Sequence, residues 1–317
     1  MKILNLTDLS KSDIKFEVSR FPDGQQQIKI LPFKIKKTSE FWVENINDSC
    51  RKKKFTIDKL VSIQIKARLN NFKDLELIIC ATKSLRALGV KEIHLYTPYF
   101  LGSRSDREFE EGSNNYLKDV ICPIINSLNF ESVTVLDPHS DVLEACLNNF
   151  KKVDNSQLIQ FFLANTYNTP HQALRFEPNG DYPFILISPD AGANKKIFKV
   201  AEQIGYTGDI ITCSKSRDVN GKLTKLEIPV STIVNKDYVL IDDICDGGAT
   251  FLQIAKTLKP RLHSSNKLYL IVTHGIFSKG FKELNKYFDG IYCTNSYKDV
   301  ADYENDEKTN VKQLNVF

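Results

Sequence analysis

Short apolar segments alternate with longer segments of helical periodicity along most of the chain. Apolar or alternating segments predict strands at 61–67, 93–96, 133–136, 184–187, 210–211, 238–241 and 268–273. Between them, apolar positions recur at helical spacing in 75–88, 117–128, 197–204 and 251–258. Strands that alternate with helices form mainly parallel sheets with helices on both faces. The pattern therefore predicts an α/β protein.

Two residues refine the predicted helices. Gly89 directly follows the last apolar position of 75–88, where a glycine commonly ends a helix. Pro123 lies inside 117–128 and predicts a kink or a restart there, because proline cannot donate the backbone hydrogen bond of a helix interior.

The length of 317 residues favours two domains, since single domains typically run roughly 100 to 200 residues. The segment 151–181 is mixed in character and separates two runs of alternating strands and helices. We therefore expect an N-terminal domain at 1–153 and a C-terminal domain at 154–317. Whether the last ~20 residues return to the N-terminal domain stays open.

Composition narrows the class of partner. The net charge is only +4 and the basic residues are scattered, so a nucleic-acid partner is not indicated. No apolar stretch approaches the ~18 residues that span a bilayer, and we expect neither a membrane segment nor a signal peptide. The seven cysteines are widely spaced and contain no C-x-x-C pair. We interpret them as reduced thiols of a cytoplasmic protein.

The segment 238–250 carries the strongest chemical signal. An apolar strand leads into Asp242 and Asp243, and the loop Asp246–Thr250 opens the helix that follows. Backbone N–H groups freed by Gly247 and Gly248, together with the positive end of that helix, suit a monoester phosphate. We expect the two acids to face the hydroxyls of a phosphorylated sugar, or a magnesium ion bound to them. Buried unpaired charge is costly, which favours a functional reading.

Other polar residues follow the predicted strands, at the edge where parallel sheets bind ligands. They are Arg104, Asp106, Arg107, His139, Asp190, Lys215 and Arg217. Such a set supplies cations for polyphosphate and carboxylates for magnesium. Each residue alone has a plainer interpretation: His139 ends a turn, Asp190 caps the next helix, and the two arginines near 105 belong to a solvated loop of mixed charge.

Taken together, these segments resemble the ribose-phosphate pyrophosphokinases (PRPP synthetases), which share the fold of type I phosphoribosyltransferases. The resemblance rests on an ordered set of motifs: Arg20-Phe21-Pro22-Asp23-Gly24, Pro98-Tyr99-Phe100 with Arg104-Ser105-Asp106-Arg107, Asp137-Pro138-His139-Ser140, Ser188-Pro189-Asp190-Ala191-Gly192, the acid pair with its loop, and Thr273-His274-Gly275-Ile276-Phe277-Ser278. These motifs run from about residue 20 to 295. The resemblance implies two phosphoribosyltransferase-like domains, each a mainly parallel sheet flanked by helices.

The resemblance also implies a reaction and its residues. Ribose 5-phosphate attacks ATP to give 5-phosphoribosyl 1-pyrophosphate and AMP with Mg²⁺ as cofactor. The implied catalytic residues are Lys215, Arg217, Arg104 and His139, and the implied metal-binding residues are His139 and Asp190. The implied ATP-binding residues are Phe21, Asp23, Gly24, Gln25, Arg104, Ser105, Asp106 and Arg107. The implied ribose 5-phosphate site is Arg217, Asp242, Asp243, Asp246, Gly247, Gly248, Ala249 and Thr250. Phe21, Asp23 and Gln25 would reach a neighbouring subunit, which implies a homo-oligomer with the nucleotide site at a subunit interface.

Three positions depart from the family pattern. The family loop normally reads Asp-Thr-Gly-Gly-Thr, so Gly247 removes one hydroxyl donor and Ala249 stands at a glycine position. Gln25 replaces a glutamate, and Ser105 replaces a glutamine. Two alternatives stay open: a non-catalytic synthetase-like regulatory subunit, and a phosphoribosyltransferase that consumes 5-phosphoribosyl 1-pyrophosphate.

Overall fold

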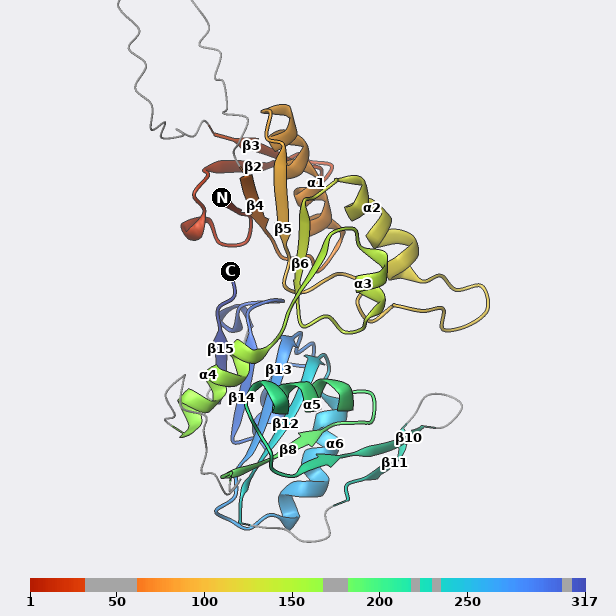
Figure 1. Ribbon diagram of the computed structural model, residues 1–317, viewed down its shortest axis with the longest axis vertical. Coiled ribbons are helices and arrows are strands. Elements are labelled where there is room, and N and C mark those ends of the chain that lie inside the picture. Colours follow the sequence, from red (N-terminus) through yellow and green to blue (C-terminus); the bar gives the residue numbers. More distant parts are fainter. Residues whose placement is uncertain (32–61, 168–181, 218–222, 230–234, 304–309) are drawn as a thin grey trace, which may run out of the picture. The chain divides into compact units, whose positions relative to one another are not determined.

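A computed structural model of the chain describes residues 1–31, 62–167, 182–217, 223–229, 235–303 and 310–317. The chain divides into two compact units (Figure 1). Met1–Val135, Ser140–Lys151 and Phe317 form the first unit, and Leu136–His139 and Lys152–Val316 form the second. Because Leu136–His139 groups with the second unit, we keep the division into 1–153 and 154–317 as a prediction.

The first unit is built on a five-stranded sheet with the order β1-β4-β5-β6-β7. Its strands are β1 (Lys2–Asn5), β4 (Ser62–Lys66), β5 (Glu92–Tyr96), β6 (Ser132–Leu136) and β7 (Phe150–Val153). The pairs from β1 to β6 are parallel. Its helices are α1 (Phe72–Ala87), α2 (Cys122–Ser127) and α3 (Val142–Cys146). The predicted strands at 61–67, 93–96 and 133–136 and the predicted helix at 75–88 are confirmed.

The two predicted breaks in these helices are also confirmed. Gly89 follows the end of α1 with a φ of +91°, a left-handed conformation that glycine adopts without steric cost. The predicted helix at 117–128 starts as a π-helical turn, Leu117–Ile121, and restarts as α2 with Pro123 in its first turn. Proline is tolerated there because the first N–H groups of a helix have no intrahelical acceptor.

The first unit also contains an antiparallel hairpin between β1 and β4. Its strands are β2 (Phe16–Arg20) and β3 (Gln26–Ile30). Gln26 ties the hairpin to α1, because its side-chain amide donates to the carbonyl oxygen of Lys73 (2.8 Å) and its backbone N–H donates to the carboxylate of Glu76 (3.1 Å). The alternating burial pattern of β3 places Gln26 and Ile28 inside.

The second unit is built on a six-stranded parallel sheet with the order β15-β14-β13-β12-β8-β9. Its strands are β8 (Phe184–Ser188), β9 (Ile210–Thr212), β12 (Asp237–Cys245), β13 (Leu268–Gly275), β14 (Gly290–Thr294) and β15 (Val311–Leu314). Its helices are α4 (Ser156–Tyr167), α5 (Asn194–Gln203), α6 (Ala249–Leu258) and α7 (Lys282–Asn285). A separate antiparallel ribbon is formed by β10 (Ser214–Arg217) and β11 (Leu223–Glu227). These elements confirm the predictions for 184–187, 197–204, 210–211, 238–241, 251–258 and 268–273.

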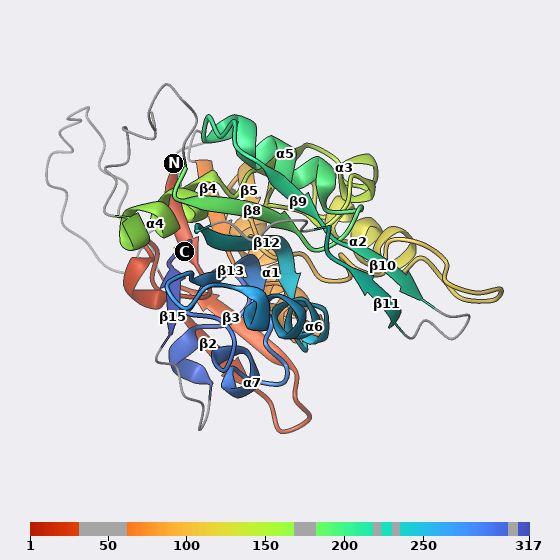
Figure 2. The ribbon, with the colours of Figure 1, turned by 90° about the horizontal axis from the view of Figure 1, so that it is seen from below.

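Helices cover both faces of this sheet. Tyr238 and Leu240 of β12 pack with the buried side of α6, whereas Val239 and Ile241 pack with α4 and α5. Figure 2 shows α5 and α6 on opposite sides of the sheet. Because successive residues of a strand face opposite sides, the continuous apolar run of β12 is what a strand buried on both faces requires. The predicted α/β class is confirmed.

The order of strands reverses between β8 and β12. From β8 the chain adds β9 on one side, and from β12 it adds β13, β14 and β15 on the other. Ligands of open parallel sheets bind at the carboxyl ends of strands at such a reversal. Pairing of β12 with β8 ends at Leu240, whereas pairing with β13 continues to Cys245. The acid pair therefore lies inside a strand that runs past its neighbour, not at the end of the strand as the sequence suggested.

The end of the chain is divided between the units. β15 pairs with β14 in the second sheet. Phe317 alone belongs to the first unit, where Lys11 Nζ donates to its carbonyl oxygen (2.9 Å). No helix in the described part of the chain is long and apolar enough to cross a membrane.

Candidate active site

The loop Asp246–Gly248 joins β12 to α6 through a left-handed residue. Gly248 has a φ of +73° and precedes the first residue of α6 without donating or accepting any side-chain capping bond. Glycine has no side chain that could accept from the first N–H groups of α6, and the positive end of the helix dipole lies beside them. Phe251, Ile254, Ala255 and Leu258 bury the other side of the helix, as predicted. This arrangement can bind an anion through backbone N–H groups.

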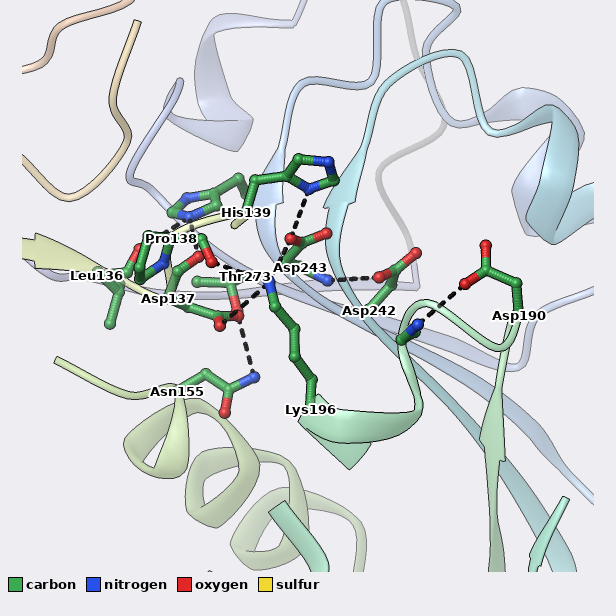
Figure 3. A network of polar contacts seen from close by, with 12 residues as sticks. Leu136, Asp137, Pro138, His139, Asn155, Asp190, Lys196, Asp242, Asp243 and Thr273 are labelled. Carbon is green, nitrogen blue, oxygen red and sulfur yellow. Dashed lines mark hydrogen bonds and ion pairs between the residues drawn. The ribbon is translucent and has the colours of Figure 1, made fainter. Parts of the chain in front are cut away.

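The two acids of β12 lie in different surroundings (Figure 3). Asp243 is buried and accepts hydrogen bonds from Lys196 Nζ and from His139 Nδ1, the latter at 2.8 Å. Asp242 is partly exposed, and its Oδ1 accepts the backbone N–H of Asp243 (2.9 Å). Of the acid pair, Asp243 is thus engaged inside the protein.

Lys196 is the centre of the buried network. Besides the carboxylate of Asp243, its Nζ contacts the carbonyl oxygen of Pro138 (3.0 Å) and Oδ1 of Asp137 (3.7 Å). Lys196 lies on α5, one helical turn from the buried Val200. It therefore links α5, β12 and the segment that carries His139.

Asp137 and His274 fix that segment from the other side. Asp137 has a φ of +40° and is buried; its Oδ2 accepts from Thr273 Oγ1 (2.5 Å) and Asn155 Nδ2 (3.2 Å). The ring of His274 is fully enclosed, with Nε2 3.0 Å from the carbonyl oxygen of Leu136. Burial lowers the pKa of His274, which keeps the ring neutral. A non-glycine residue at positive φ persists only where its surroundings hold it.

The charges of the network set the protonation of its members. Burial alone would raise the pKa of Asp243, but the hydrogen bond from His139 and the charge of Lys196 lower it below the usual aspartate range. Because ionised Asp243 can only accept, His139 donates this hydrogen bond from Nδ1. In contrast, burial and the neighbouring charge of Asp243 raise the pKa of Asp242, and Asp190 adds to this effect.

Asp190 follows its plainer interpretation, whereas the side chain of His139 is hydrogen-bonded to Asp243 and no capping bond from it is seen among the described residues. Oδ1 of Asp190 accepts the backbone N–H of Ala193 (3.0 Å), just before α5 begins. The His139 side chain is 39% exposed and held at one nitrogen only by Asp243. Both side chains still lie at the carboxyl edge near Asp242. Among the described residues, no three His, Cys, Asp or Glu side chains are grouped so that they could hold a metal ion by themselves.

The predicted nucleotide residues lie in the first unit. Phe21, Asp23, Gly24 and Gln25 form the turn between β2 and β3, in which the Gln25 N–H donates to Asp23 Oδ1 (3.1 Å). Gly24 has a φ of +95°, and Phe21 is 47% exposed. This turn displays an aromatic side chain on a fixed backbone.

The loop Arg104–Arg107 is anchored by its backbone. The Ser105 N–H donates to Gly102 O (2.8 Å), and Asn115 Nδ2 donates to Asp106 O (2.7 Å). Arg107 lies over the ring of Phe109 (5.3 Å). Arg104 and Arg107 are exposed.

Lys215 and Arg217 lie on β10. Their side chains are outside the described part of the structure, so their predicted roles stay predictions. β10 pairs with β11 in a ribbon that is separate from the six-stranded sheet.

Sequence reasoning missed Lys196, Asp137, Thr273 and His274. Asp137, Thr273 and His274 stood in the motifs that carried the resemblance, and a histidine near the end of a largely apolar strand was an available signal. No sequence signal pointed to Lys196, because its partners Asp243 and Pro138 lie 47 and 58 residues away in the chain.

The fold and the site define an α/β protein with a glycine-bearing loop after an acid pair at the strand reversal. Comparisons with known proteins are more specific. The chain is 27% identical to the ribose-phosphate pyrophosphokinase of Mycoplasmopsis pulmonis over 237 residues, which are 74% of this chain and 67% of the relative. It is 26% identical to that of Saccharolobus solfataricus over 266 residues, which are 83% and 78% of the two chains.

The solved structures agree on the fold. The phosphoribosylpyrophosphate synthetase of Mycobacterium smegmatis matches 100% of this chain and 95% of its own with a TM-score of 0.71 at 12% identity. No model of a protein family matches the chain. The predicted resemblance to the ribose-phosphate pyrophosphokinases is confirmed, and with it the predicted fold.

Proposed function

We propose that the chain is a ribose-phosphate diphosphokinase. It transfers the β,γ-diphosphoryl group of ATP to the anomeric hydroxyl of ribose 5-phosphate and releases 5-phosphoribosyl 1-pyrophosphate and AMP. The observation that carries the proposal is the loop Asp246–Gly248 with its left-handed glycine and uncapped helix, in a chain similar to proteins named ribose-phosphate pyrophosphokinase. The names of these relatives support the prediction that the chain is an enzyme.

The sugar and its phosphate would bind at the β12–α6 loop. Backbone N–H groups of Gly247–Thr250 would hold the 5-phosphate, and Asp242 and Asp246 would hold ribose hydroxyls. We assign Asp243 a different role from the predicted one: it orients His139, because its carboxylate is already engaged by His139 and Lys196. Lys215, Arg217 and Arg104 would place fixed positive charge beside the migrating diphosphoryl oxygens.

Mg²⁺ fits the charge of this edge. The pKa of Asp242 is raised first by burial and then by the negative charges of Asp243 and Asp190, so a cation at this edge would offset part of that repulsion. Mg²⁺ is commonly held by one or two protein groups and the phosphates of its substrate, so Asp190 and His139 Nε2 suffice as protein contacts to a metal–ATP complex. When bound, the ion would neutralise phosphate charge and align the attacking and leaving oxygens.

We further propose a homo-oligomer in which the β2–β3 turn reaches the nucleotide of a neighbouring subunit. Phe21 supports this, because its exposed ring stands on a hydrogen-bonded turn and is available to contact the nucleotide of a neighbouring chain. ATP and ribose 5-phosphate would be the substrates. A cytoplasmic location stays a prediction; the described cysteines, all free thiols, are compatible with it.

The test is formation of AMP by the purified chain with Mg²⁺ and ATP, with and without ribose 5-phosphate. We expect AMP only when both substrates are present. Pyrophosphate release that depends on a nitrogenous base and 5-phosphoribosyl 1-pyrophosphate, with no need for ATP, would instead assign a phosphoribosyltransferase. The chain would instead be a regulatory subunit if it binds both substrates without turnover and associates with an active synthetase. The altered loop Asp246–Thr250 is the feature that favours this alternative.

A further inference from the structure

The turn Ile276–Gly280, which follows β13, is held against the end of β12 and the β12–α6 loop by backbone hydrogen bonds. The backbone N–H groups of Ile276 and Phe277 both donate to the carbonyl oxygen of Cys245 (2.8 and 3.0 Å). The backbone N–H of Ser278 donates to the carbonyl oxygen of Asp246 (3.2 Å). The buried ring of Phe277 packs against Phe281, with ring centroids 4.6 Å apart. The position of the next residue, Lys279, relative to the loop is therefore set by main-chain hydrogen bonds.

The side chain of Lys279 lies along Gly247. Its Cδ and Cε are each 3.5 Å, and its Cγ 3.7 Å, from the point that a Cβ on Gly247 would occupy. The ammonium group lies one bond beyond Cε. Lys279 is exposed, and in the described part of the structure no acidic side chain forms an ion pair with it. A cation thus borders the loop without an internal partner.

The loop itself is poor in groups that suit a phosphate ester. Gly247, Gly248 and Ala249 have no polar side chains, Asp246 adds a negative charge, and Thr250 contributes one hydroxyl but no positive charge. A phosphate monoester carries between one and two negative charges at neutral pH, since its second pKa is about 6. Helix N–H groups supply only a partial positive charge of roughly half a unit. The described residues of the loop therefore leave part of the ester's charge without a counter-charge.

We propose that Lys279 binds the 5-phosphate of the pentose held by this loop. The inference rests on the proposed function for the identity of the sugar phosphate. Lys279 offers three donors on a flexible stem, which suits a compact anion. It also accounts for the departure at Gly247: a cation from the β13–α7 turn takes over the interaction that a side-chain hydroxyl of the loop would make.

The experiment compares Lys279→Ala with Lys282→Ala, which removes the same charge from an exposed position on α7. Calorimetry measures binding of ribose 5-phosphate, and steady-state assays measure KM for each substrate. For Lys279→Ala we expect the affinity for ribose 5-phosphate to fall by at least about 10-fold, because one charge-assisted contact is lost. The KM for ribose 5-phosphate should rise by a similar factor, and the KM for ATP should change little. Lys279→Arg should retain most of the affinity, and Lys282→Ala should bind as the unaltered chain does.

The outcomes separate this inference from the proposed function. If the unaltered chain forms AMP and Lys279→Ala binds ribose 5-phosphate equally well, Lys279 has no role in binding and only this inference is overturned. If the unaltered chain forms no AMP but binds ribose 5-phosphate with an affinity that depends on Lys279, the inference stands and the proposed reaction does not. Absence of ribose 5-phosphate binding to the unaltered chain would overturn both.

Discussion

Adjacent carboxylates acquire opposite electrostatic surroundings because successive residues of a strand face opposite sides of the sheet. Asp243 points to the side of α5, where Lys196 compensates its charge. Asp242 faces away from that lysine and is repelled by Asp243 and Asp190. Such repulsion is expected at a site that binds a cationic ligand, since binding sites commonly lower the stability of the ligand-free protein.

Asp242→Asn should stabilise the folded chain while it lowers turnover. The folded-state pKa of Asp242 is raised above its unfolded value of about 3.9, so its contribution to stability is present below that pH and is lost as pH rises through the folded pKa. Asparagine does not ionise. We expect a gain of about 1 kcal/mol in the free energy of unfolding at pH 8, without Mg²⁺, and almost none at pH 4.

Urea unfolding of both chains at the two pH values measures this difference. Added Mg²⁺ should stabilise the unaltered chain more than the variant, because a cation held nearby by Asp190 and His139 would attract the ionised carboxylate of Asp242, which the variant lacks. A variant less stable than the unaltered chain at pH 8 would contradict the assigned repulsion.

Lys196→Met should destabilise the second unit strongly. The change removes the cation from a carboxylate that is only 5% exposed and also frees the carbonyl oxygen of Pro138. Removing one partner of a buried ion pair typically costs about 3 kcal/mol or more. Lys199→Met, on an exposed position of the same helix, is the matched control and should unfold at nearly the same urea concentration as the unaltered chain. Equal losses from the two substitutions would refute a structural role for the Lys196 network.

The residues of the site could be predicted only where they stood in an ordered local motif. The loop Asp246–Thr250 and Asp190 lie where their segments suggested, because each follows its strand directly. The different roles of Asp242 and Asp243 could not be predicted, since they depend on the face of the sheet on which Lys196 lies. That contact joins residues far apart in the chain and has no local signal.

At the scale of elements, long apolar runs were the reliable signal and short polar strands were not. β8 and β12 are buried on both faces, and their composition predicts this. β10 reads Ser-Lys-Ser-Arg and has no apolar residue, so no hydrophobic period indicates a strand. β14 and β15 were also missed; β15 is a short strand at the edge of the sheet and gains its order from its neighbour β14. α4 was missed because it lies in the segment 151–181, which we could not resolve from its mixed composition.

The β12–α6 connection depends on a single left-handed residue. Gly248→Ala should cost about 1 kcal/mol or more, because an L-residue is strained at positive φ and the new Cβ would lie 3.2 Å from Leu284 Cδ2. Gly247→Ala is the control, since its φ is not positive and its Cβ would make an ordinary 3.5 Å contact. Thermal unfolding of the two variants compares these costs. A larger loss at position 247 than at 248 would exclude the proposed loop geometry.

At the scale of the whole molecule, the proposed nucleotide site requires residues from separate parts of the chain. The β2–β3 turn belongs to the first unit and Lys215 to the second. We expect Lys215→Ala to lower kcat by orders of magnitude with little loss of stability, because β10 lies outside the six-stranded sheet. We expect Phe21→Ala with Asp23→Ala to raise KM for ATP through lost adenine contacts.

Mixing the two variant chains tests whether one site draws on two subunits. In a mixed oligomer, some sites would combine an intact β2–β3 turn from one subunit with an intact Lys215 from its neighbour. Co-expressed chains with different tags, purified through both tags, should therefore form AMP at low ATP faster than the sum of the separate variants. The same purification of two chains that both carry Lys215→Ala controls for residual activity. If mixed oligomers gain nothing over that sum, each nucleotide site is completed within one subunit, and the exposed Phe21 needs another explanation.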